Sequence, residues 1–199
     1  MLFNSKTNLK VKYVLAQIPE LCSQKSMARK KGFNNICEIG KERIRRAGQK
    51  ILKQNLSTQE RVDTGFRNFK LDSSNMKEVY YTPDKFIPET LSLFIDNVKP
   101  DRTPEDLLFQ TMNSLGIELS AKIQEKQILN KKVFSVDDGY LLACFDESLT
   151  EDVIDEMAQL LPTYLVIRNT SVDQDSILDN FNQIVKSYSM QKEIKIKVI

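Results

Sequence analysis

The chain of 199 residues contains no histidine and only three cysteines, Cys22, Cys37 and Cys144. Because histidine is the most frequent general base and metal ligand, its absence excludes Ser–His and Cys–His catalysis. The cysteines are odd in number and form no CxxC pair, which argues against a disulfide framework and against a zinc site. We therefore expect reduced thiols and no bound metal.

Long apolar runs are missing as well. No stretch approaches the roughly 18 apolar residues that indicate a membrane-spanning helix, and the first ten residues lack the apolar core of a signal peptide. A hydrophobic content of 41% is enough for a packed core. We expect a cytoplasmic globular protein without a membrane partner.

The formal net charge of +2 is unevenly distributed. Sixteen acids and six bases lie between Asp101 and Asn180, whereas two acids and ten bases lie between Gln24 and Lys53. These ten bases form what we call the basic front: Lys25, Arg29, Lys30, Lys31, Lys41, Arg43, Arg45, Arg46, Lys50 and Lys53. The basic front could face an anionic partner, or it could be a solvated helix face with pairs such as Glu42 and Arg46. Charge alone favours the solvated face.

The N-terminal quarter of the chain predicts a strand, a loop and a helix. Residues 10–18 are rich in β-branched and aromatic side chains, which predicts a strand whose upper part is buried on both faces and which ends at Pro19-Glu20. Residues 21–32 predict a loop with one helical turn, closed by Gly32. Residues 34–53 then predict an amphipathic helix. Its apolar face carries Ile36, Ile39, Gly40, Ile44, Ala47 and Ile51.

Arg43 interrupts this apolar face. On a helical projection Arg43 lies between Ile36 and Ile39, so its guanidinium leaves from the apolar side. A charge in that position requires a partner or a wet cleft.

The remainder of the chain predicts a second domain. Residues 55–64 carry no clear period and are interpreted as a linker between domains at 1–54 and 65–199. Strand-like residues follow Gly65, and a helix is expected at about 88–98. Thr103-Pro104 predicts the start of a helix that Gly116 closes. Further elements are expected as strands at 121–128, 132–136, 140–145, 164–168 and 193–199 and as helices at 150–161 and 174–188, with an Asp138-Gly139 hairpin turn.

Alternation of strands and helices after residue 139 predicts an α/β layer with at least one crossover connection. The acid Glu20, which follows a predicted buried strand and precedes a helix, is placed as in a Rossmann-like sheet that holds a ribose. Alone this signal is weak, because an acid at a strand end is usually a solvated loop residue and no GxG turn is present.

Two further groups of residues have both functional and structural interpretations. The acid pairs Asp137-Asp138 and Asp146-Glu147 adjoin turn residues, which favours solvated loops over a metal or catalytic site. Five aromatic residues could stack on bases, but membership of a core is favoured: Phe66, Phe69, Tyr80, Tyr81 and Phe86.

Several runs of the sequence together resemble the DNA methyltransferase (Mod) subunit of type III restriction-modification systems. The similarity follows a single order along nearly the whole chain. The runs are Tyr13-Val-Leu-Ala-Gln-Ile-Pro-Glu20, Gly32-Phe-Asn-Asn-Ile-Cys-Glu-Ile-Gly-Lys-Glu-Arg-Ile-Arg-Arg-Ala-Gly48, Gly65-Phe-Arg-Asn-Phe-Lys-Leu-Asp-Ser-Ser-Asn75, Arg102-Thr-Pro-Glu-Asp-Leu-Leu-Phe-Gln110, Leu115-Gly-Ile-Glu-Leu-Ser120 and Leu142-Ala-Cys-Phe-Asp146.

The resemblance implies a chemistry and places two residues in it. Mod enzymes transfer a methyl group from S-adenosylmethionine to N6 of an adenine that is turned out of duplex DNA. By resemblance, Glu20 corresponds to the acid that holds the cofactor ribose, and 36–47 to the helix after that strand. Arg43 corresponds to the arginine that this helix carries, either as an anchor of the fold or in the cleft. The partners implied are duplex DNA, a second Mod chain and the restriction (Res) subunit.

The sequence also departs from the family. It contains neither the Asp-Pro-Pro-Tyr loop that receives the adenine nor the Phe-x-Gly-x-Gly turn that holds the methionine end of the cofactor. In the family both motifs precede the position of Glu20. We therefore expect a C-terminal portion of a Mod protein: a partial Rossmann-like methyltransferase segment followed by a C-terminal α/β domain, with no catalytic residue of its own and inactive alone. The alternatives are a stand-alone module that binds Mod or Res, and a DNA-binding module that uses the basic front.

Overall fold

The structure is a computed structural model that describes residues 11–54, 63–77, 97–168, 175–188 and 192–199. At 175–178 only the backbone is described. The chain divides into two compact units, Met1–Lys70 and Leu71–Ile199, which we call unit 1 and unit 2.

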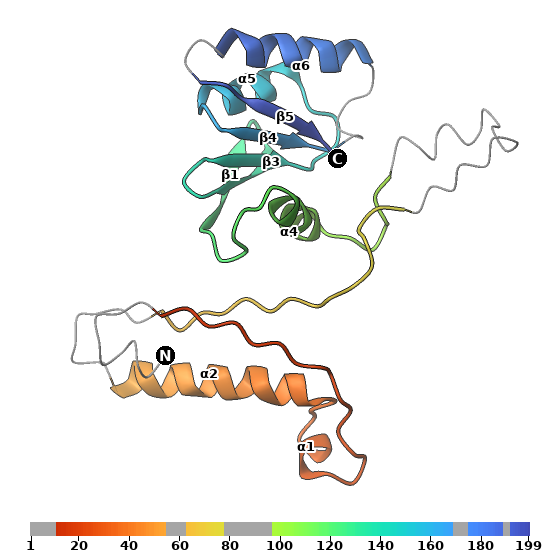
Figure 1. Ribbon diagram of the computed structural model, residues 1–199, viewed down its shortest axis with the longest axis vertical. Coiled ribbons are helices and arrows are strands. Elements are labelled where there is room, and N and C mark those ends of the chain that lie inside the picture. The colour runs from red at the N-terminus through yellow and green to blue at the C-terminus, as the bar shows by residue number, and fades with distance from the viewer. Residues whose placement is uncertain (1–10, 55–62, 78–96, 169–174, 189–191) are drawn as a thin grey trace, which may run out of the picture. The chain divides into compact units, whose positions relative to one another are not determined.

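The described part of unit 1 contains two helices, α1 (Met27–Lys30) and α2 (Ile36–Gln54) (Figure 1). Helix α1 begins after Ser26, whose hydroxyl accepts a hydrogen bond from the Arg29 amide at 3.2 Å. Gly32 follows with a φ of +88°, a left-handed conformation that favours glycine. The predicted helical turn and the predicted long helix are both confirmed.

Helix α2 begins with reciprocal hydrogen bonds between side chains and backbone. The Asn35 side chain accepts from the Glu38 amide at 3.0 Å, and the Glu38 carboxylate accepts from the Asn34 amide at 2.7 Å. This arrangement satisfies amides that the first turn of a helix leaves unpaired. It explains why α2 starts at this point in the sequence.

The buried face of α2 differs from the predicted stripe. Ile51 and Gly48 are buried and Ile44 is half-buried, whereas Ala47 is exposed. The buried face is therefore rotated away from Ala47 toward Gly48. The predicted stripe followed the periodicity of the sequence, which does not specify how far a helix is rotated against its neighbours.

The strand predicted at 10–18 is wrong for its described part. Residues 11–20 form no strand, and every one of them is exposed. Residues 63–70, where strand-like residues were also expected, form none either. Composition indicates which segments can fill a half-buried sheet, but a strand exists only where another strand pairs with it. No partner strand is present in the described residues of unit 1.

Unit 2 is an α/β structure with a mixed five-stranded sheet in the order β1-β2-β3-β4-β5 (Figure 1). The strands are β1 (Ile123–Ile128), β2 (Lys131–Val136), β3 (Leu141–Cys144), β4 (Tyr164–Ile167) and β5 (Lys195–Val198). Its helices within the described residues are α4 (Pro104–Ser114), α5 (Glu151–Gln159) and α6 (Asp175–Tyr188). All eight elements were predicted, with small differences at their ends.

Strand pairing follows from the connections. Strands β1, β2 and β3 are joined antiparallel by tight turns, and the second turn contains Asp138 (φ 50°) and Gly139 (φ +97°). Strands β3, β4 and β5 pair in parallel, and α5 and α6 form the two crossovers. The predicted hairpin and crossover connections are confirmed.

The sheet is covered on both faces, with α5 and α6 on one face and α4 on the other (Figure 1). Successive strand residues alternate between the two cores, so Leu142 packs with α5 and α6 and its neighbour Leu141 packs with α4. Phe134 and Phe181 are the largest fully buried side chains of the two layers. The central strands are therefore apolar at consecutive positions.

Two predictions fall largely outside the described residues. Of the linker predicted at 55–64, only 63 and 64 are described, and they form no helix or strand. The helix predicted at 88–98 lies outside the described residues except for 97 and 98, which are not helical. Val98 instead pairs with Met76 in an isolated bridge. The domain boundary at 55–64 stays a prediction, although the two units divide after Lys70.

Candidate functional site

Glu20 lies beside the N-terminal end of α2. Its backbone carbonyl accepts a hydrogen bond from the Ile36 amide at 3.1 Å. Next to it, Leu21 and Asn35 form an isolated bridge, and the Cys22 amide donates to the Asn34 carbonyl at 2.9 Å. These contacts attach the end of the exposed segment to the start of the helix, and the described residues of unit 1 form no sheet around them.

The environment of Glu20 fits a ligand with hydroxyl groups better than it fits an anion. Glu20 is exposed, so its carboxylate is open to hydrogen-bond donors such as the hydroxyls of a ribose. Helix N-termini attract anions through free amides. In α2, however, the amides of Ile36 and Glu38 are already used by Glu20 and Asn35.

Arg43 is exposed on α2. Because the buried face is rotated toward Gly48, the guanidinium leaves the helix on its solvent side and not on the apolar side that was predicted. About 10 Å of helix axis separates Arg43 from Ile36, the residue that contacts Glu20. In the described parts of the chain, Glu20 and Arg43 form no contact with each other.

The predicted pair of Glu42 with Arg46 is present. The Arg46 guanidinium contacts the Glu42 carboxylate at 2.7 Å, and Arg45 approaches the same carboxylate at 3.8 Å. The Arg45 guanidinium also lies over the Phe66 ring, 5.9 Å from its centroid. Arg45 is therefore engaged within unit 1, through a weak ion pair and a cation–π contact.

The acid pairs of unit 2 are surface features and do not converge. Asp137 and Asp138 are exposed in the β2–β3 turn, where Asp138 pairs with Lys122 at 2.9 Å. The Asp146 carboxylate accepts a hydrogen bond from the Lys132 amide at 2.7 Å, beyond the other end of the hairpin. Among the residues that the structure describes, no group of three or more His, Cys, Asp or Glu residues could hold a metal.

The aromatic residues do not form a stacking platform in the described chain. Phe66 is half-buried beneath Arg45, and Phe69 is 48% exposed, so the core position predicted for Phe69 is wrong. Tyr80, Tyr81 and Phe86 lie outside the described residues.

All three cysteines are free thiols, and one of them is deeply buried. Burial raises the pKa of the Cys144 thiol to about 11. At neutral pH Cys144 is therefore protonated and unsuited to act as a nucleophile. Cys22 and Cys37 are half-buried, and the Cys37 thiol contacts the Gln17 carbonyl at 3.6 Å.

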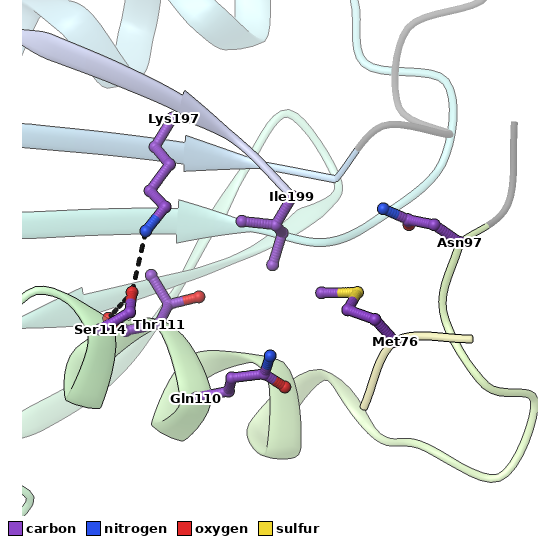
Figure 2. Close-up of a pocket in the computed structure, with 7 residues that line it drawn as sticks. All are labelled: Met76, Asn97, Gln110, Thr111, Ser114, Lys197 and Ile199. Carbon is purple, nitrogen blue, oxygen red and sulfur yellow. Dashed lines mark hydrogen bonds between the residues drawn. The ribbon is translucent and has the colours of Figure 1, made fainter. Parts of the chain in front are cut away.

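A cavity of about 300 Å³ in unit 2 was not predicted (Figure 2). Lys197 of β5 crosses its rim and donates a hydrogen bond to the Ser114 hydroxyl of α4 at 2.8 Å. The buried Asn97 side-chain oxygen has no hydrogen-bond partner among the described residues. The lining residues are Met76, Asn97, Gln110, Thr111, Ser114, Lys197 and Ile199. They come from separate segments without a shared motif, so sequence patterns cannot indicate this cavity.

Comparison with known proteins returned no match, neither to a family model nor to a curated protein. No helix in the described stretches of the chain is both long enough and apolar enough to cross a membrane.

Proposed function

We propose that this chain is the C-terminal portion of a type III Mod adenine-N6 DNA methyltransferase. Residues 11–54 would supply one strand and one helix of the cofactor-binding sheet, and unit 2 would serve assembly. The proposal is supported by the ordered sequence resemblance and by a mismatch between sequence and environment in unit 1.

That mismatch is the observation that carries the proposal. Val14 is 95% exposed, Leu15 72% and Ile18 75%. Neighbouring residues of a strand point to opposite faces, so Val14 and Leu15 would each require an apolar cover. Such a strand belongs in the middle of a sheet that helices cover on both sides.

Burial of these side chains would contribute a large free energy for so short a segment. Burying an exposed valine, leucine or isoleucine side chain contributes about 1.5–3 kcal/mol each. Backbone groups of 13–16 form no hydrogen bond with other described residues, so they remain available for pairing. Pairing with the edge of a complementary sheet would bury these apolar side chains and would give the backbone groups hydrogen-bond partners.

Each residue of the proposed site has a defined role. S-adenosylmethionine supplies the methyl group when it is bound. The exposed Glu20 carboxylate would accept hydrogen bonds from the ribose hydroxyls, and α2 would hold the turn that carries Glu20 through the Ile36 amide. The adenine-binding loop and the glycine turn would come from another polypeptide segment, because these 199 residues contain neither motif.

The proposal is tested by reconstitution. The purified chain is mixed with a type III Mod segment that carries the Phe-x-Gly-x-Gly and Asp-Pro-Pro-Tyr motifs, and transfer of labelled methyl groups to duplex DNA is measured. We expect transfer by the mixture and none by either part alone. Methylation by this chain alone, or no transfer and no association in the mixture, would contradict the proposal.

Two variants sharpen this test. Glu20→Ala should raise the KM for S-adenosylmethionine with a smaller effect on kcat, because the ribose contact is made before and during transfer. Val14→Asp should prevent association with the complementary segment. The matched controls lie in unit 2, where Glu193→Ala removes an exposed acid and Leu129→Asp changes an exposed leucine. Equal effects of the test and control variants would exclude the proposed roles.

A second candidate is an assembly module that binds Mod or Res. The observation that favours it is that unit 2 has a covered five-stranded sheet of its own and carries all sixteen acids between Asp101 and Asn180. It predicts a stable complex between unit 2 and an intact Mod or Res chain. Size-exclusion chromatography with light scattering tests this complex with residues 71–199. The two candidates differ in unit 1, because only the first predicts that unit 1 associates with the motif-bearing Mod segment and that Val14→Asp abolishes this association.

A further inference from the structure

Four bases form a stripe along the solvent side of α2. Arg43, Arg46, Lys50 and Lys53 are spaced at i, i+3, i+7 and i+10, which places them on one helix face. All four are exposed. We call these residues the α2 stripe.

The charge of the α2 stripe is poorly compensated. Glu42 is the only acid between Lys41 and Gln54, and its carboxylate pairs with Arg46 at 2.7 Å. A solvated helix face commonly alternates acids and bases at i,i+4, which would neutralise each base locally. Here Arg43, Lys50 and Lys53 have no acid of their own on α2. Three exposed positive charges therefore remain along the helix.

The dimensions of the stripe suit a chain of phosphates. Ten residues of helix separate Arg43 from Lys53, which is about 15 Å along the axis. Each strand of duplex DNA presents one phosphate per roughly 3.4 Å of its axis, so a similar length offers about four phosphates. Over this length the cations and the phosphates of one strand are therefore similar in number.

We infer that the α2 stripe binds the phosphodiester backbone of a nucleic acid. The contact is electrostatic and independent of base sequence, because lysine and arginine reach phosphates without reading base edges. Lys30 and Lys31, which are exposed on α1 and just after it, add positive charge to the same unit. The inference depends on α2 alone and does not require the function proposed above.

An anionic membrane surface fits this helix less well. Surface-bound helices insert an apolar face that adjoins their cations. The apolar face of α2 is turned inward instead, with Ile51 buried and Ile44 half-buried in unit 1. Leu52 is the one large apolar side chain of α2 among the exposed residues that the structure describes, so the helix offers cations with little apolar surface for insertion.

The test measures binding of the full chain to fluorescently labelled duplex DNA, single-stranded DNA and duplex RNA by fluorescence anisotropy across a salt series. We expect binding at low salt that weakens steeply as salt rises, with a slope that corresponds to about three or four phosphate contacts. The three nucleic acids share the recognised backbone, so the arm with the highest affinity identifies the natural source. No binding of any of them at low salt would overturn the inference.

Matched variants separate the stripe from overall charge. R43Q/K50Q/K53Q removes three stripe charges and leaves the Glu42–Arg46 pair in place. K126Q/K186Q/K195Q removes three exposed lysines from unit 2, so both variants lower the net charge from +2 to −1. We expect the stripe variant to bind at least about tenfold more weakly, with a salt slope smaller by about one per base removed. The unit 2 variant should bind within about twofold of the unchanged chain.

Two further measurements test whether a loss of binding reflects the lost charge and not a change in the fold. R43K keeps the charge and should keep the affinity, and circular dichroism should show unchanged helix content in the stripe variant. Equal losses in the two triple variants would overturn the inference, because overall charge would then explain the binding. Binding to phosphatidylserine vesicles but to no nucleic acid would overturn it in favour of a lipid surface.

Discussion

Two N-cap threonines have the same backbone conformation, but only one of them caps its helix with its side chain. Thr103 and Thr150 both precede helices, and their φ and ψ angles are nearly identical, at −93° and 160° for Thr103 and −93° and 161° for Thr150. The Thr103 hydroxyl accepts from the Asp106 amide at 3.3 Å, and the Asp106 carboxylate accepts from the Thr103 amide at 2.9 Å. Thr150 forms no such side-chain bond. Only Thr103 therefore completes a capping box.

Thr103→Ala should destabilise unit 2 by about 1 kcal/mol, the usual contribution of an N-cap side chain. Thr150→Ala should lower the free energy of unfolding by clearly less, because no capping hydrogen bond is lost. The free energies of unfolding in urea measure both. Equal costs for the two substitutions would show that the Thr103 bond contributes nothing.

The same capping box predicts a pH dependence. The hydrogen bond from the Thr103 amide lowers the pKa of Asp106 below its usual range. The stabilising contribution of Asp106 is therefore present above its unfolded pKa of about 3.9 and lost as the pH falls through the lower folded value. Asp106→Asn should flatten the loss of stability between about pH 4 and pH 2. An unchanged pH profile in this variant would contradict the prediction.

Cys144 should be the least reactive thiol of the folded chain. It is fully buried and its pKa is raised to about 11, so at pH 8 it is neutral and inaccessible. The C22S/C37S variant should show no rapid reaction with Ellman's reagent until the protein is unfolded, when one thiol should react. Fast labelling of this variant in the native state would contradict the burial of Cys144.

At the scale of elements, helix α5 derives its stability from one face. Met157 is fully buried between the helices and the sheet, whereas Leu160, three residues later, is 49% exposed. The stability of a helix of this length comes mainly from packing, because short helices are marginal alone. The apolar side chains of Met157 in α5 and of Leu160, the C-cap residue that follows it, therefore have very different energetic roles.

Met157→Ala should lower the free energy of unfolding by about 2–5 kcal/mol, through lost apolar contact and a cavity. Leu160→Ala removes a side chain of similar size and should change it by about 0.5 kcal/mol or less. Urea unfolding followed by circular dichroism measures both variants. Similar losses would indicate that the exposed face of α5 is covered in solution.

At the scale of the whole molecule, the two units differ in how completely they are formed. Both apolar cores lie wholly within unit 2. In unit 1, the described buried residues are Gly48 and Ile51, while Val14, Leu15 and Ile18 are exposed. Unit 2 therefore has the core of an independent domain, whereas the described part of unit 1 buries few side chains.

A fragment of residues 71–199 should fold by itself. Its urea unfolding midpoint should equal that of the main transition of the full chain, because the described residues that form both cores lie in 71–199. Circular dichroism and intrinsic tyrosine fluorescence report both transitions. A fragment that fails to fold, or one with a clearly lower midpoint, would show that unit 1 contributes to this core.

Local signals account for most of the correct predictions in unit 2. Thr103-Pro104, Asp138-Gly139 and Gly116 mark helix starts, turns and helix ends through short-range chemistry, and the structure places these features where they were predicted. The errors concern burial. The exposure of Ala47 and of the segment 11–20 depends on what packs nearby, which periodicity does not specify.

The features of the candidate site also fall into two groups, those that local sequence patterns indicated and those that depend on tertiary contacts. Glu20 was identified by its place between a β-rich segment and a helix, and the backbone contact with Ile36 supports that neighbourhood. The Lys197–Ser114 contact at the cavity could not be predicted, because it joins residues that are 83 positions apart. The ribose role of Glu20 stays a prediction that the reconstitution test addresses.

The sequence by itself determined the order and type of the elements in unit 2, the hairpin turn and the amphipathic character of α2, because caps, turns and periodicity act over a few residues. Only the tertiary structure decided which face of α2 is buried, that Arg43 points to solvent, and that the apolar segment 11–20 forms no strand. The physical reason is that burial and strand pairing depend on distant partners. The segment 11–20 has the composition of a central strand, and in the described chain it has no sheet to join.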